Sequence, residues 1–310
     1  MTTTTSNDDA VTHTRRNGLW WVGGIASIAV IVLAVIARDS TLSPIKAIVL
    51  GAVEGITEFL PISSTGHLLV TERLLGLGTG SSKTAMDTYT VAIQLGAILA
   101  VIGIYRAHLV AMARGLVGRD RDGRRLLGLV AVAVIPSAVV GLALDDTIKA
   151  HLFGVWPVIA AWIVGGLFLL VWRPATGRTV LGEVTMRHAA IIGAAQVLAL
   201  WPGTSRSLVT IAAALAIGLT TSAAVEFSFL LGLATLSAAT GLDLVKHGSE
   251  LTDQFGIATP TLGAIVAAIT AAAAVTWFVN YLRTRPMAVF GWYRLGIAAV
   301  TIVLVATHQV

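Results

Sequence analysis

Apolar runs of about 18 residues or more recur along this chain, and each is long enough to cross the hydrocarbon core of a bilayer as a helix. Apolar side chains make up 56% of the 310 residues and charged ones only 12%, with a mean hydropathy of +0.85. One soluble core could not bury that much apolar surface. The pattern therefore predicts an all-α polytopic membrane protein.

Cysteine content and charge exclude two other classes. The chain has no cysteine, which excludes a disulfide-stabilised secreted domain. A net charge of +5 could indicate a nucleic-acid partner, but the arginines lie in short links between apolar runs and no basic patch is interleaved with aromatic residues. We therefore interpret them as topology determinants and expect no nucleic-acid partner.

The chain begins with a polar, Thr-rich segment, residues 1–18, which we predict to be a disordered cytoplasmic tail. Leu19–Ala37 follows as an extra N-terminal transmembrane helix. A cleaved signal peptide ending near Ala37 is the alternative, although this apolar stretch exceeds the usual length of such a segment.

Six further spans are expected, which brings the total to about seven: Thr90–Tyr105, Leu126–Leu144, Val155–Trp172, Ala223–Asp243, Leu262–Leu282 and Met287–Thr307. Three links, 106–125, 173–187 and 283–285, are rich in arginine and should be cytoplasmic. The alternating links, 145–149 and 246–253, lack this excess and should face outward.

Two apolar stretches, Ile45–Leu75 and Ala189–Leu219, are interrupted by proline and polar residues. The sidedness of the basic links requires the first to enter and leave from outside and the second to do so from the cytoplasm. We therefore predict two re-entrant helical hairpins of opposite orientation in an inverted-topology repeat. Repeat one covers about 44–144 and repeat two about 187–282, within a single domain over 44–310. Such folds place a site near the midplane, where broken helices direct their N-terminal ends at an anion.

The first hairpin carries two carboxylates at membrane depth. Glu54 and Glu58 are four residues apart and so share one helix face. Burying both is costly unless a cation, a proton or a polar cavity compensates. Pairing with structural arginines is the plainer interpretation. Together they could also hold Mg²⁺ or Ca²⁺ against phosphate oxygens, whereas zinc is improbable at a site with one His and no Cys.

Hydroxyl clusters follow the proline of each hairpin. Ser63, Ser64 and Thr65 are placed to begin a half-helix, where free backbone N–H groups favour phosphate. Thr204 and Ser205 match them in the second hairpin, beside Arg206, a permanent phosphate ligand. Ordinary helix capping would explain either cluster alone.

His67 lies within reach of the same hydroxyls. It could deprotonate a serine nucleophile, attack phosphorus itself or protonate the leaving group, and the sequence does not separate these roles. The combined set predicts a clamp for a phosphate ester or anhydride with an acid/base pair.

Two signatures resemble those of the undecaprenyl-diphosphatase family, the bacitracin-resistance proteins of bacterial membranes. The first is Glu54-Gly55-Ile56-Thr57-Glu58-Phe59-Leu60-Pro61-Ile62-Ser63-Ser64-Thr65-Gly66-His67, and the second is Pro202-Gly203-Thr204-Ser205-Arg206-Ser207 with Thr210. Further similarity lies at 93–101, at 226–231 and at Tyr293-Arg294. The resemblance runs from about Pro44 to the C-terminus. Leu208 stands where the family pattern leads us to expect glycine.

The resemblance implies hydrolysis of the C55 lipid carrier diphosphate to monophosphate and phosphate at the outer face of the bacterial inner membrane, in cell-wall carrier recycling. It gives Glu54 and Glu58 metal and acid/base roles and makes Ser64 or His67 the nucleophile. Arg206 and neighbouring hydroxyls, including Ser207 and Thr210, would hold the diphosphate. It implies a magnesium or calcium requirement and inhibition when bacitracin sequesters the substrate. A homodimer is compatible with it, although the sequence does not determine the oligomeric state.

Two other functions were weighed. Membrane phosphatases of the phosphatidic-acid type need a histidine six residues after their arginine, but that position from Arg206 is Ala212, so this interpretation fails. A polyprenyl-phosphate transporter or flippase is the remaining alternative, because inverted repeats with charges at the midplane are typical of carriers.

Overall fold

The computed structural model describes residues 42–77, 83–175 and 177–310. The predicted tail over 1–18 and the predicted first span, Leu19–Ala37, lie outside the described residues. Within the described part, helices account for nearly all of the regular structure, and Thr179 and Leu219 form one isolated parallel bridge.

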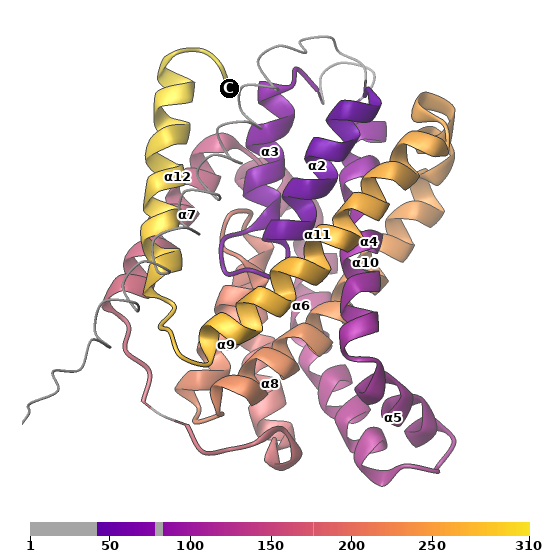
Figure 1. The fold of residues 1–310 in the computed structure, drawn as a ribbon, viewed down its shortest axis with the longest axis vertical. Helices are drawn as coiled ribbons and strands as arrows, with labels where there is room; N and C mark the ends of the chain where they lie inside the picture. Colours follow the sequence, from indigo (N-terminus) through magenta and orange to yellow (C-terminus); the bar gives the residue numbers. More distant parts are fainter. Residues whose placement is uncertain (1–41, 78–82, 176) are drawn as a thin grey trace, which may run out of the picture.

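The helices follow one another along the chain as shown in Figure 1: α2 Pro44–Thr57, α3 Ser64–Leu74, α4 Lys83–Ile104, α5 Arg106–Leu116, α6 Arg121–Leu152, α7 Val155–Val171, α8 Met186–Gln196, α9 Arg206–Ala216, α10 Thr221–Phe255, α11 Ala258–Leu282 and α12 Ala288–Ala306, with short 3₁₀ turns at Leu181–Glu183 and Val197–Leu200. Five of them, α4, α6, α10, α11 and α12, are long and apolar enough to cross a bilayer, and α7 is a shorter apolar helix. Each predicted span after residue 83 thus corresponds to a helix, and the chain is an all-α, multi-pass membrane protein.

Several helices extend beyond the apolar segments that predicted them. α6 and α10 continue through the links that we predict to face outward, and the arginine-rich link 106–125 contains α5. Apolar length marks only the part of a helix that lipid covers, whereas the ends are set by caps. Asp120 caps α6 by accepting from the backbone N–H of Gly123, and α10 stops at Gly256, whose φ is +66°.

Two hairpins of broken helices approach each other from opposite ends of the molecule (Figure 1). α2 and α3 form the first, with residues 58–63 as its tip, and α8 and α9 form the second, with residues 201–205 as its tip. Ser63 and Ser205 cap the second helix of each hairpin and share an uncommon backbone, with φ of 72° and 75°. The predicted half-helix starts are confirmed.

Each hairpin packs against a long helix of the other repeat. α2 contacts α11, and a Cβ at Gly51 would overlap the carbonyl of Gly263. α8 contacts α6, and a Cβ at Gly193 would overlap the carbonyl of Ala133. Gly51 and Gly193 hold equivalent places in the two hairpins. The crossed packing fits the predicted inverted repeat and fixes both tips in the centre of the bundle.

Candidate active site

The two tips meet at an ion pair. Glu58 follows the last residue of α2, and Arg206 is the first residue of α9. Arg206 Nη2 lies 2.8 Å from Glu58 Oε1, and the two side chains are only 12% and 7% exposed. A guanidinium and a carboxylate from opposite hairpins are therefore in direct contact, whereas the sequence predicts only that both groups hold one phosphate.

Ser64 joins this pair from the first turn of α3. Its hydroxyl donates a short hydrogen bond to Glu58 Oε2, the carboxylate oxygen that Arg206 does not bind. Glu58 therefore has one oxygen on the guanidinium and the other on a serine hydroxyl. This arrangement can orient Ser64 and accept its proton, which is the relation between a nucleophile and its general base.

Hydroxyls of the second tip bind the backbone of the first. Ser205 Oγ and Ser207 Oγ both donate to the carbonyl of Leu60, at 3.2 and 2.8 Å. Ser205 Oγ also accepts from the backbone N–H of Leu208 and so caps α9. Leu208 is an ordinary buried residue in the first turn of this helix, so no glycine is needed there.

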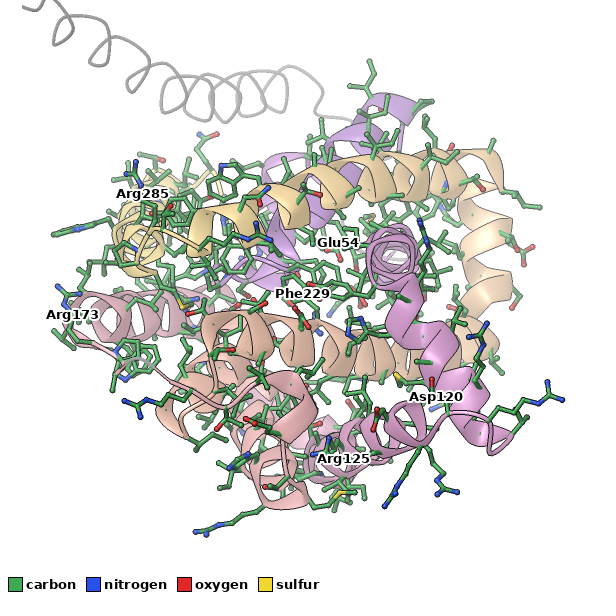
Figure 2. All side chains as sticks on the ribbon, turned by 60° about the horizontal axis from the view of Figure 1, so that its bottom comes forward. Glu54, Asp120, Arg125, Arg173, Phe229 and Arg285 are labelled. Carbon is green, nitrogen blue, oxygen red and sulfur yellow. The ribbon has the colours of Figure 1, made fainter. Side chains whose placement is uncertain are left out.

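Arg206 lies in a close-fitting space. Its guanidinium carbon is 5.5 Å from the centre of the Phe59 ring, and Phe59 in turn packs edge-on against Phe229. A Cβ at Gly232 of α10 would overlap the guanidinium, so glycine is required there for Arg206 to reach Glu58. Figure 2 shows Phe229 and Glu54 in the middle of the bundle, with Arg173 and Arg285 at its rim.

Glu54 differs from Glu58 in having no hydrogen-bond donor among the described residues. Its side chain is fully buried in α2, and neither carboxylate oxygen accepts a hydrogen bond. The charges of Glu58 and Arg206 act on it directly. Because a buried acid without a donor is costly, Glu54 is the group at this site that most needs a proton or a cation.

His67 lies one turn after Ser64 in α3 and contacts α7 and α12. Its Nδ1 is 2.7 Å from the carbonyl of Ser63, and its Nε2 is 2.8 Å from the hydroxyl of Tyr293 on α12. The ring packs against Trp162 of α7 and is stacked on Tyr293. A carbonyl only accepts, so Nδ1 carries hydrogen, and Nε2 of the neutral ring accepts from Tyr293. Both ring nitrogens thus have partners away from the Glu58–Arg206 pair.

The remaining predicted hydroxyls do not bind the side chains of the Glu58–Arg206 pair in the described structure. Thr65 is exposed in the first turn of α3, and Thr204 is half-buried at the second tip. Among the described contacts, neither hydroxyl binds Glu58 or Arg206. Thr210 is fully buried, and its hydroxyl bonds to the carbonyl of Arg206 at 2.8 Å and to Ser228 Oγ at 2.6 Å. Thr210 therefore joins α9 to α10 rather than lining the ion pair.

Two carboxylates and nearby hydroxyls form only part of a cation site. Within 42–77, 83–175 and 177–310, no group of three His, Cys, Asp or Glu side chains is placed to hold a metal. The unpartnered oxygens of Glu54 are hard donors of the kind that Mg²⁺ and Ca²⁺ prefer. Mg²⁺ commonly binds one or two carboxylates and completes its shell with substrate phosphates and water. The residues fit such an ion if the substrate supplies the other ligands.

Sequence reasoning gave no role to Arg294 of α12, which is fully buried and bonds to both tips. The signal that could have found it is its position inside the apolar run Met287–Thr307, because an ionisable residue at membrane depth points to function by default.

Taken together, the fold and site define a polytopic membrane protein with two opposed broken-helix hairpins and an acid–serine–arginine cluster where they meet. A model of the family described as bacitracin resistance protein BacA matches residues 47–300. The chain belongs to this family.

Named relatives cover most of the chain. An undecaprenyl-diphosphatase of Sorangium cellulosum is 46% identical over 264 residues, which is 83% of this chain and 84% of the relative. The undecaprenyl-diphosphatase of Nitrosomonas eutropha is 43% identical over 85% of this chain and 94% of its own length. Undecaprenyl-diphosphatase 2 of Rhodospirillum rubrum is 43% identical, with coverages of 83% and 93%.

Proposed function

We propose that this protein is an undecaprenyl-diphosphate phosphatase, which hydrolyses the C55 lipid carrier diphosphate to the monophosphate and inorganic phosphate. Family membership and the names of the relatives support the activity. The observation that carries the proposal on this chain is the contact of Glu58 with both Ser64 and Arg206.

Ser64 is the nucleophile in this proposal. As its oxygen bonds to the terminal phosphorus, its proton passes to Glu58, and the bridging P–O bond breaks so that the lipid monophosphate leaves with the electron pair. Ser64 is preferred to His67 because its hydroxyl already touches the acceptor carboxylate, whereas both nitrogens of His67 are engaged elsewhere.

A water molecule then attacks the phosphoserine. Its oxygen forms the new bond to phosphorus, the P–O bond to Ser64 breaks, and Glu58 returns its proton to the serine oxygen. Dihydrogen phosphate leaves, and the side chains are restored. Arg206 and the N-termini of α3 and α9 offset the charge on the phosphoryl oxygens in both steps.

A divalent cation, Mg²⁺ or Ca²⁺, would be held by Glu54 and Glu58. When bound, it would neutralise phosphate charge and favour departure of the monophosphate. Glu54 is its main protein ligand in this proposal, since the oxygens of Glu58 already bind Ser64 and Arg206.

The protein would lie in the bacterial inner membrane with its site open to the outer face, so that the recycled carrier can return to cell-wall synthesis. Single cysteines at exposed Asp145 and Arg121, at opposite ends of α6, test this orientation in a chain with no other thiol. An impermeant thiol reagent added to intact cells should label the first and not the second. Labelling at Arg121 would reverse the orientation.

The inverted repeat also favours a second candidate, a carrier that moves a lipid phosphate without cleaving it. Purified protein in detergent, given C55 diphosphate and Mg²⁺, separates the two. The proposed enzyme releases one phosphate per diphosphate consumed, and a pure carrier releases none. Chelation by EDTA should suppress the release, with activity restored by added Mg²⁺ or Ca²⁺.

A further inference from the structure

Arg294 binds the backbone of three separate segments. It lies in α12 and is fully buried. Its guanidinium donates to five carbonyls, those of Pro61 at 3.2 Å, Gly203 at 2.9 Å, Thr204 at 3.1 Å, Ala161 at 2.7 Å and Trp162 at 3.4 Å. None of these hydrogen bonds goes to a carboxylate. The planar donor fork of arginine is therefore used to join the two tips to α7.

The first tip is held at every carbonyl between residues 60 and 62. Leu60 accepts from Ser205 and Ser207, Pro61 accepts from Arg294, and Ile62 accepts from the indole N–H of Trp162 at 2.9 Å. This short segment joins Glu58 to Ser64. Its conformation thus sets how the carboxylate faces the hydroxyl.

The second tip is held by the same guanidinium. Gly203 and Thr204, whose carbonyls Arg294 binds, immediately precede the cap and first turn that carry Arg206. One side chain from outside both hairpins therefore fixes the approach of the two segments that supply Glu58, Ser64 and Arg206.

We propose that Arg294 is a positioning residue for the phosphatase reaction, acting through the backbone of both tips. This inference rests on the proposed function and deepens it. A buried cation whose described hydrogen bonds all go to carbonyls is a costly way to stabilise packing, since apolar side chains of similar size often serve as well. What the buried arginine provides is a fixed position of one tip relative to the other. Catalysis is sensitive to small displacements of reacting groups.

Substitution of Arg294 should lower kcat far more than it changes KM. In Arg294→Met, we expect kcat per folded molecule to fall about 100-fold, because misplacement by about 1 Å can cost that much. KM should stay within about threefold, because Arg294 binds only protein carbonyls. Arg294→Lys keeps the charge but loses the planar set of N–H donors, and its kcat should lie between those of Arg294→Met and wild type. The control is Thr301→Val, a buried α12 position whose hydroxyl bonds only to its own helix.

Two adjacent glycines of α7 give a second test that leaves Arg294 in place. A Cβ at Gly165 would overlap the guanidinium, whereas a Cβ at Gly166 would lie 3.1 Å from the carbonyl of Gly291 and touch α12 without reaching Arg294. Both substitutions tighten the same α7–α12 contact. Only Gly165→Ala should lower kcat, by about 10-fold or more.

Two readouts keep this proposal separate from the proposed function. Wild-type phosphate release tests the activity. Spin labels at Thr65 and Trp201, one beside each tip, report the distance between the tips without requiring turnover. We expect a narrow distance distribution in wild type and Gly166→Ala, and a broadened one in Gly165→Ala and Arg294→Met.

The positioning role is wrong if Gly165→Ala and Arg294→Lys keep both a narrow distribution and kcat within about twofold of wild type. It is also wrong if KM rises as much as kcat falls, because that would indicate direct substrate contact. A wild type without phosphatase activity would refute the function, while the label distances would still decide whether Arg294 sets the tips.

Discussion

The two hairpins share a backbone but differ in charge. Both turn at a serine with φ near 70° and pack through an equivalent glycine. In the first, Glu54 is a buried acid to which no described residue donates a hydrogen bond. In the second, the equivalent Gln196 donates from Nε2 to Ser137 Oγ at 2.6 Å. One position therefore holds an acid without a hydrogen-bond donor among the described residues in one repeat and a residue that joins two helices in the other, and we propose a chemical role only for the first.

This comparison shows why both hairpins are needed. The first supplies the carboxylates and the candidate nucleophile, and the second supplies the guanidinium. Each helix N-terminus brings the same partial positive charge, so the scaffold favours an anion from both sides. In the proposed mechanism, the difference in side chains decides where proton transfer and where charge neutralisation take place.

Removing the charges that face each other should have the largest effect. Arg206→Ala and Glu58→Ala should each lower phosphate release by about 1,000-fold, because both groups act on developing charge. Expression and membrane insertion should stay intact, as judged by membrane yield and size-exclusion profile. Near-normal turnover in either variant would show that the site is wrongly assigned.

The pair of equivalent positions is the sharpest test of the comparison. Glu54→Gln should lower turnover about 100-fold and shift the Mg²⁺ titration to higher concentration, since a neutral amide is a weaker cation ligand. Gln196→Ala should keep turnover within about threefold but lower stability by about 1–3 kcal/mol, because Ser137 loses a buried donor. Equal kinetic effects in the two variants would contradict the proposed division of roles.

A glycine in α10 tests the space around Arg206. Gly232→Ala should reduce kcat about 30-fold, because its methyl group would displace the guanidinium from Glu58. Gly241→Ala, in the same helix with open space around the position, is the matched control and should retain activity. Equal activity of the two variants would mean that the contact with Glu58 is dispensable.

The smallest effect is expected where hydroxyls hold the tips together. Ser207→Ala removes one of two donors to the Leu60 carbonyl, which keeps its bond from Ser205. A single neutral hydrogen bond contributes about 1 kcal/mol, so kcat should fall about fivefold. Ser205→Ala also removes the cap of α9 and should cost more, as a lower thermal midpoint would show.

Much of the fold could be predicted because its signals are local. Apolar length identified α4 and α11, and proline followed by small hydroxyl residues identified the half-helix starts at Ser63 and Ser205. The i,i+4 spacing of Glu54 and Glu58 and the arginine in the second signature predicted that these groups converge on one site, although the direct contact of Glu58 with Arg206 was not predicted. The extra N-terminal span, the cation and the oligomeric state stay predictions.

Other features depend on contacts far apart in the chain. α5 was missed because its polarity resembles that of a link, although it packs against α6 through glycines. His67 was expected beside Ser64, but Tyr293, 226 positions later, binds its Nε2. The partners of Arg294 are backbone carbonyls of distant segments. Every residue has a carbonyl, so the pattern of side chains in the sequence does not identify these partners.

The sequence by itself determined that the chain enters a bilayer, where two hairpins break, and which charges they carry. Hydrophobic length, caps and charge asymmetry act over a few residues, so the sequence displays them directly. Only the tertiary structure decided that Glu58 binds Ser64 and Arg206 together, that Glu54 has no hydrogen-bond donor within the described part of the chain, and that Arg294 binds the backbone of both tips. Those outcomes depend on how helices distant in sequence cross, and their close approach is set by packing in three dimensions.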